Sequence, residues 1–249
     1  MRSAGSDPII VAERLTIGYG DTVVLENLDF AIPRGEVFAI LGGSGSGKST
    51  VLRHLIGLET PMAGSILVDG APPVRGTGAP AYGVLFQSGA LFGSMTLAEN
   101  VSLPLRKWTR LDPRAIDTIV RSKLRLVGLE GFENHLPAEI SGGMKKRAGI
   151  ARALALDPPL LFLDEPSAGL DPVSSADLDA LILTLNRSLG MTTVIVTHEL
   201  PSIFAIVTEC ILVDHATRGI VARGKPAQLR DAATDPLVRA FFNRRAQAA

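Results

Sequence analysis

The chain has 249 residues, enough for one large domain or two small ones, and its 46% hydrophobic and 20% charged residues are an ordinary soluble globular balance. The formal net charge is zero, which argues against a dedicated nucleic-acid-binding protein. The single cysteine, Cys210, excludes an internal disulfide and lies in an apolar run, where we expect a small buried side chain.

The N-terminal part of the chain is predicted to form an antiparallel β region. Residues 1–8 are polar and do not have the pattern of a signal peptide, and no apolar stretch in the chain is long enough to span a membrane. Strand patterns cover residues 9–17 and 23–32, with a turn at 18–21 between them. A short strand at 64–69 and a loop at 71–80, rich in proline and glycine, complete this part.

A glycine-rich stretch then organises the chain, because it fits the phosphate-loop pattern G-x-x-x-x-G-K-[ST]. The apolar run at 37–41 before it predicts a strand buried on both faces, and apolar residues at helical spacing follow it. Its glycines allow backbone N–H groups to turn toward an anion, Lys48 adds a charge for the outer phosphates, and the Ser49 hydroxyl can hold Mg²⁺. We therefore predict a nucleoside triphosphate site. The stretch comprises Gly42, Gly43, Ser44, Gly45, Ser46, Gly47, Lys48, Ser49 and Thr50.

Beyond residue 80 the sequence alternates between predicted strands and helices. A strand at 82–86 ends at Gln87, and helices at 96–105, 113–127 and 144–156 indicate a helical insertion at about 88–155, with Asp112 capping the second helix. Buried strands at 160–163 and 193–196 flank a helix at 174–189. Short strands near 211–213 and 220–222 precede a last helix from 236 to about 245. This alternation predicts an α/β fold with a mostly parallel sheet.

Polar residues follow several of the predicted strands. Asp164 can hold the metal ion, and the adjacent Glu165 can polarise the attacking water. Because parallel strands bring their carboxyl ends to one edge of the sheet, His198 can reach the terminal phosphate or the water there. Gln87 offers a neutral oxygen to Mg²⁺ or water at the same edge. Each residue alone could simply end a strand, and the phosphate loop favours the catalytic interpretation.

A second glycine-rich tripeptide, formed by Ser141, Gly142 and Gly143, is a weak signal alone because most such tripeptides are turns. It precedes a predicted helix, however, and so presents free N–H groups to an anion. The helical insertion should hold it away from the chain's own phosphate loop. We therefore predict a homodimer in which each ATP lies between Lys48 of one subunit and Ser141 of the other.

These ordered motifs resemble those of the ABC-type ATPases over nearly the whole chain. The resemblance implies one ABC ATPase domain over residues 1–249, of the α/β class, with a RecA-like, mostly parallel sheet core, an N-terminal antiparallel β region and a helical subdomain at about 88–155. It also implies ATP and Mg²⁺ as cofactors. The roles that it implies are adenine stacking for Tyr19, the Q-loop for Gln87, the Walker B metal ligand for Asp164, the catalytic glutamate for Glu165, the D-loop for residues 167–171 with Asp171, and the switch histidine for His198.

Residues 140–144 resemble the signature motif of this family, whose usual form is L-S-G-G-Q. Met144 replaces the polar glutamine of that form. The serine and glycine N–H groups, which the resemblance assigns to phosphate contact, are retained.

A narrower resemblance is to the ATPase subunits of Mla-type, Mce-associated transporters, which move phospholipid between the membranes of Gram-negative bacteria. Residues 86–92, 99–106 and 141–144 carry it. It implies a homodimer at the cytoplasmic face of the inner membrane and an integral-membrane permease that docks between Gln87 and Phe92. It further implies an Mce protein and a STAS-domain protein in the complex, and no nucleic acid.

The docking prediction depends on Leu91 and Phe92, which we expect to be exposed; the alternative is that both pack against the helical insertion. Two other functions also stay open. An importer of a metabolite or ion would use the same hydrolytic motifs. A soluble ABC ATPase acting on DNA or ribosomes would typically carry a coiled-coil insertion or two ATPase domains.

Overall fold

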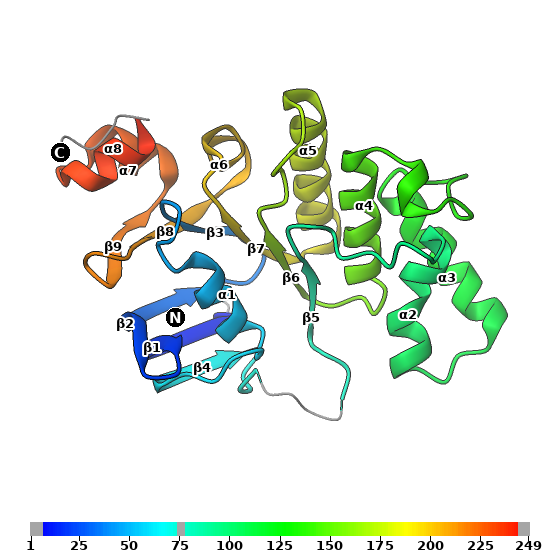
Figure 1. Cartoon of the computed structure of the whole chain (residues 1–249), viewed down its shortest axis with the longest axis horizontal. Coiled ribbons are helices and arrows are strands. Elements are labelled where there is room, and N and C mark those ends of the chain that lie inside the picture. The colour runs from blue at the N-terminus through cyan, green and yellow to red at the C-terminus, as the bar shows by residue number, and fades with distance from the viewer. Residues whose placement is uncertain (1–6, 74–77, 244–249) are drawn as a thin grey trace, which may run out of the picture.

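Two β-sheets form the framework of the computed structural model, which describes residues 7–73 and 78–243 (Figure 1). The smaller sheet is antiparallel, with the order β2-β1-β4, and confirms the predicted N-terminal region. β1 runs two residues further than predicted, since Gly18 and Tyr19 still pair with Val23 and Thr22. Its strands are β1 (Ile10–Tyr19), β2 (Thr22–Ile32) and β4 (Ala63–Val68).

The larger sheet has the strand order β5-β6-β7-β3-β8-β9 and confirms the predicted mostly parallel core. Only its edge strand β9 runs antiparallel to its neighbour. The middle strands are buried along nearly their whole length, which explains why they read as continuous apolar runs in the sequence. Its strands are β3 (Val37–Leu41), β5 (Tyr82–Leu85), β6 (Leu160–Asp164), β7 (Thr192–Thr197), β8 (Glu209–Asp214) and β9 (Gly219–Gly224).

Three helices gather beyond the β5 edge of this sheet, while α1 (Lys48–Leu55) lies near the small sheet (Figure 1). Thr96 and Glu99 form a capping box at the start of the first of them, and Asp112 caps the second as predicted. Their apolar faces share one hydrophobic cluster with β6 and α5 (Pro172–Leu189). The three helices are α2 (Leu97–Trp108), α3 (Pro113–Leu126) and α4 (Gly142–Ala153).

Several helix predictions need correction. α4 spans 142–153 rather than 144–156, because Ser141 caps it two residues early. α5 begins at Pro172 rather than 174, because Asp171 is its N-cap and proline suits the first helical position. The short helices α6 (Leu200–Ile206) and α7 (Pro226–Ala232) were not predicted, since seven residues give too little periodicity. α8 covers Pro236–Phe242, and the predicted helix end near residue 245 lies outside the described residues.

Two further predictions concern Cys210 and membrane-spanning segments. Cys210 is buried in β8, and burial raises the pKa of its thiol to about 12, so it is a packing residue as expected. Within residues 7–73 and 78–243, no helix is both long and apolar enough to cross a bilayer.

Candidate active site

The phosphate-loop stretch lies between β3 and α1, and close packing of its backbone explains two of its glycines. A Cβ on Gly42 would lie 2.3 Å from Ser46 Oγ and 2.5 Å from the carbonyl oxygen of Val213. Gly47, the N-cap of α1, has a φ of 96°, which favours glycine. Ser49, in the first turn of α1, is exposed and so accessible to a ligand.

Lys48 is almost fully buried in this loop although it carries a charge. Its Nζ donates to the carbonyl oxygens of Gly42 at 2.9 Å and Gly43 at 2.8 Å. Burial lowers the pKa of its ammonium group, and the nearby Glu165 and Asp164 carboxylates oppose that shift. The ammonium group therefore already lies inside the loop in which a phosphate would bind.

Asp164 ends β6, and its Oδ1 is a buried oxygen without a hydrogen-bond partner in the described structure. Burial and the neighbouring Glu165 raise the pKa of its carboxyl, while Lys146 and Lys48 partly offset them. An unpartnered carboxylate oxygen fits a hard cation. Mg²⁺ is usually held by one or two carboxylates together with substrate phosphates, so a single Asp164 oxygen beside the phosphate loop suits it.

Glu165 follows directly and forms the centre of a hydrogen-bonded group at the carboxyl edge of the sheet. Its Oε1 lies 2.8 Å from His198 Nδ1, and its Oε2 accepts a 3.2 Å bond from Thr197 Oγ1. Because a carboxylate only accepts, the hydrogen between Glu165 and His198 belongs to Nδ1. The structure thus brings Asp164, Glu165 and His198 together, as the sequence predicted from strand ends.

Two other predicted ligand-binding residues are accessible but less fixed. Tyr19 ends β1 with 46% of its surface exposed, and its hydroxyl lies 3.0 Å from Thr50 Oγ1, which ties it to the first turn of α1. An exposed ring held in this way can stack on a base. Gln87 lies two residues beyond β5 with an exposed side chain, so its predicted role at the metal stays a prediction.

Ser141, Gly142 and Asp171 are exposed, the first two at the start of α4 and the third at the start of α5. Figure 1 shows α4 and α5 on the other side of β6 and β7 from α1. Ser141 Oγ accepts the N–H of Met144 at 3.2 Å and caps α4. Met144, which stands where the usual signature motif has glutamine, packs against the hydrophobic cluster around α4 and so has a structural role. Asp171 caps α5, and its bonds to Ser174 lower the pKa of its carboxyl.

Lys146 is a site residue that sequence reasoning missed. It is buried in α4, and its Nζ donates to the carbonyl oxygens of Gln87 at 2.5 Å and Glu165 at 3.2 Å. The signal that could have found it is its position, three and four residues before the buried Gly149 and Ile150, which predicts the core-facing side of the helix.

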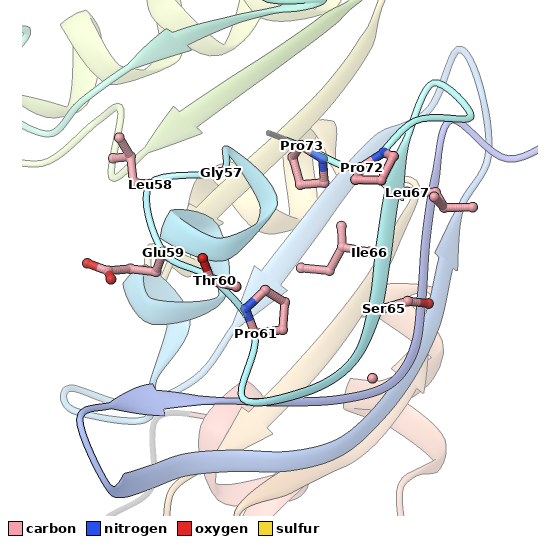
Figure 2. Close-up of a pocket in the computed structure, with 11 residues that line it drawn as sticks. Gly57, Leu58, Glu59, Thr60, Pro61, Ser65, Ile66, Leu67, Pro72 and Pro73 are labelled. Atoms are coloured by element: carbon pink, nitrogen blue, oxygen red, sulfur yellow. The ribbon is translucent and has the colours of Figure 1, made fainter. Parts of the chain in front are cut away.

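A cavity of about 660 Å³ lies elsewhere, between the end of α1, β4 and the prolines at 72 and 73 (Figure 2). Its walls include the side chains of Leu58, Ile66 and Leu67. None of its lining residues belongs to the candidate active site.

Comparisons with known proteins agree on one family. The model of the ABC transporter family matches residues 25–168. A probable ribonucleotide transport ATP-binding protein of Mycobacterium leprae is 48% identical over 196 residues, 76% of this chain and 56% of the relative. The intermembrane phospholipid transport system ATP-binding protein MlaF of Escherichia coli K12 is 41% identical over 230 residues, 90% of this chain and 84% of the relative. This chain thus spans about half the length of the mycobacterial relative.

Solved structures give the same result. The cbiO1 protein of Clostridium perfringens, part of an ABC transporter complex, has a TM-score of 0.82 at 30% identity. The superposition covers 91% of this chain and 92% of the cbiO1 chain. The ATP-binding cassette MJ0796, solved as a dimer bound to ADP and Pi, has a TM-score of 0.76 at 30% identity and covers 87% of this chain and 98% of its own.

Proposed function

The chain belongs to the ABC transporter family, and we propose that it hydrolyses ATP to drive a membrane transporter. The observation that carries this proposal is the geometry of Glu165, held by His198 at 2.8 Å at the same sheet edge as Asp164. A carboxylate in such a position can orient and deprotonate a water molecule. Lys48 lies in the adjacent loop and can hold the phosphates that the water attacks.

Each residue then has a distinct role. Glu165 accepts a proton from the water, and His198 Nδ1–H fixes the orientation of its carboxylate. Lys48 would exchange its two carbonyl partners for phosphate oxygens, which requires little movement because its ammonium group already lies in the loop. Asp164 and Ser49 would hold Mg²⁺, which neutralises charge on the phosphates when bound. Tyr19 would position the base.

We infer a homodimer in which the signature residues of one subunit close the nucleotide site of the other. The exposed N-terminus of α4 and its separation from α1 support this arrangement (Figure 1). The dimeric cassette at 30% identity supports it too. In a two-fold dimer, Ser141, Gly142 and Gly143 of each subunit would face the phosphate loop of the partner.

The proposed cargo is phospholipid, moved between the membranes of a Gram-negative bacterium. The relative named for intermembrane phospholipid transport supports it, because that similarity covers 90% of this chain. The relative named for ribonucleotide transport favours a second candidate, an importer of a metabolite, at 48% identity over a shorter region. The hydrolytic residues would serve both functions equally.

The proposed partners are a permease, an Mce protein and a STAS-domain protein at the cytoplasmic face of the inner membrane. Phe92 is 57% exposed at the proposed permease contact, whereas Leu91 is half-buried against the helical cluster. The expectation that both are exposed is therefore wrong for Leu91. Phe92 is therefore the main apolar contact of the proposed docking site. Phe92→Asp should release the protein from membranes, while Leu189→Asp, at another exposed apolar residue, should not.

Glu165→Gln tests the ATPase proposal. It keeps the shape of the side chain but removes the basic carboxylate, so turnover should fall by roughly 10²–10⁴ while ATP still binds. The variant should accumulate as an ATP-bound dimer in gel filtration. Turnover close to that of the wild type would rule out Glu165 as the base, and wild-type protein that binds ATP without hydrolysing it would refute the proposed activity.

The cargo is tested with the tagged protein purified from its own membranes. An Mce protein in the complex, together with ATP turnover that phospholipid stimulates in the reconstituted complex, would support phospholipid. Stimulation by ribonucleotides in place of phospholipid would favour the second candidate.

A further inference from the structure

We propose that Lys146 is a positioning residue that fixes the backbone at Glu165 and ties it to the loop beginning at Gln87. This inference rests on the proposed ATPase activity. β5 and β6 are neighbouring parallel strands, and the chain leaves the sheet just after each of them. The single ammonium group of Lys146 donates to one carbonyl beyond each strand end, at 2.5 Å to Gln87 and 3.2 Å to Glu165. It therefore joins two carbonyl groups that lie beyond the pairing of β5 with β6.

The buried charge of Lys146 indicates that this side chain does more than fill space in the core. Lys146 is 6% exposed, and burial lowers the pKa of its ammonium group while Asp164 and Glu165 oppose the shift. Its two hydrogen-bond partners are neutral peptide carbonyls. A methionine of similar length could fill the same space without desolvating a charge. The lysine is thus best explained by the carbonyls that it holds.

Glu165 needs such support because its backbone is strained. Its φ is 44°, a left-handed conformation that non-glycine residues adopt only when several contacts impose it. β7 and the residue after it supply three of these contacts: the 2.8 Å bond from Glu165 N to Val196 O and the two bonds of the carboxylate to Thr197 and His198. Lys146 supplies the contact to the carbonyl group from outside the sheet. The same carbonyl oxygen accepts the N–H of Ala168 at 3.1 Å, so without Lys146 that single bond would hold the peptide after Glu165 and the carboxylate would be positioned less firmly.

The loop at the other end of the link is held in the same way. Ala90 has a φ of 48°, and Arg152 of α4 donates to its carbonyl oxygen at 2.6 Å and to that of Gly89 at 3.2 Å. Lys146 and Arg152 therefore fix residues 87–90 to α4, the helix that starts at the signature tripeptide. A displacement of this loop by a permease would reach Glu165 through Lys146.

The test uses Lys146→Met, with Lys145→Met as the matched control. Lys145 directly precedes Lys146 in α4, carries the same charge and is half-buried, but no side-chain bond joins it to either loop. In the purified dimer, Lys146→Met should lower kcat for ATP about 10–100-fold, as misplacement of a reacting group does, and leave KM within about twofold. Lys145→Met should leave both unchanged. Lys146→Gln, which replaces the ammonium donor with a neutral N–H donor, should recover part of kcat.

A double-mutant cycle with Glu165→Gln separates positioning from mere stability. If Lys146 acts through Glu165, Lys146→Met should have almost no further effect on the residual turnover of Glu165→Gln. Equal losses in both backgrounds, or a fall in ATP affinity and thermal midpoint that accompanies the loss of kcat, would overturn the inference. So would a kcat equal to that of Lys145→Met. The proposed function fails separately, through wild-type protein without turnover or Glu165→Gln without loss.

Discussion

The phosphate-loop side of the candidate site, defined as residues 42–50 with Asp164, contains close backbone contacts and charged groups that are buried. On the signature side, defined as residues 141–143 with Asp171, the chain is largely exposed and its polar side chains cap helices. The first side contains a glycine that no other residue can replace without a clash, a buried lysine and an unpartnered carboxylate oxygen. The second contains none of these features.

This difference between the two sides shows where the needs of ligand binding lower the stability of the folded subunit. Buried charges and close backbone contacts cost stability and are kept where ligands bind. Capped helix starts instead stabilise the subunit. Changes on the signature side that keep the two helix caps should therefore spare the isolated subunit and affect only a dimer, whereas changes on the phosphate-loop side should alter the subunit itself.

The largest expected effect comes from linked heterodimers, in which the two sides are damaged in chosen combinations. With Lys48→Ala in one subunit and Ser141→Arg in the other, a composite arrangement damages one site twice and leaves the second intact. With both changes in one subunit, both composite sites are damaged. Occluded nucleotide per dimer should therefore be about one in the first pairing and about zero in the second.

Occlusion is a better measurement than turnover here, because hydrolysis can require both sites at once. A site contained within one subunit predicts the opposite pattern, since a doubly mutated subunit leaves its partner whole. Occlusion by the second pairing alone would therefore refute the composite site. A linked dimer without substitutions, which should occlude two nucleotides, is the control.

A smaller effect should distinguish two glycines. Gly42→Ala should destabilise the isolated subunit by about 1–3 kcal/mol, since its Cβ meets a backbone oxygen at 2.5 Å. Gly143→Asp should not, because the nearest atoms to a Cβ there lie 3.6 and 3.7 Å away, and an acidic residue in the first turn of α4 suits the helix dipole. Its charge would nevertheless repel the partner's nucleotide.

Thermal midpoints and ATP binding of the isolated subunits, followed by nucleotide-dependent dimerisation, check this pair. Gly42→Ala should have a lower thermal midpoint than the wild type. Gly143→Asp should have an unchanged or higher thermal midpoint but should no longer dimerise with nucleotide. A destabilised Gly143→Asp subunit would mean that the signature side, too, is constrained by its own fold.

The comparison also explains what the sequence could predict. The apolar runs that end at Leu41 and Asp164 give buried strands, and parallel pairing then brings Asp164, Glu165 and His198 to one edge. These inferences need only local patterns. The bonds of Lys146 join residues 59 and 19 positions away, and they depend on how α4 packs against the ends of β5 and β6. No local pattern contains that packing, just as none contains the left-handed backbone at Glu165.

The smallest effect compares the two aspartates in the nucleotide-free protein. Burial raises the pKa of Asp164, so the folded state holds its proton more tightly than the unfolded state does, and this group makes the wild type less stable as pH rises through the raised pKa. Asp164→Asn removes the ionisable group, so at neutral pH it should raise the thermal midpoint by about 2–4 °C, the shift that ~1 kcal/mol gives in a protein of this size. The gain should disappear in acid, where Asp164 is protonated.

Asp171 should show the opposite sign. Its bonds to Ser174 lower its pKa, so its contribution to stability is present above the unfolded pKa and is lost as pH falls through the folded one. Asp171→Ala should therefore lower the thermal midpoint at neutral pH, and the difference from wild type should shrink in acid. Calorimetric scans over a pH series, without nucleotide or Mg²⁺, measure both variants. If Asp164→Asn lowered the midpoint at every pH, interactions within the fold would stabilise the ionised Asp164 carboxylate. The two sides would then not differ in how their aspartates affect stability.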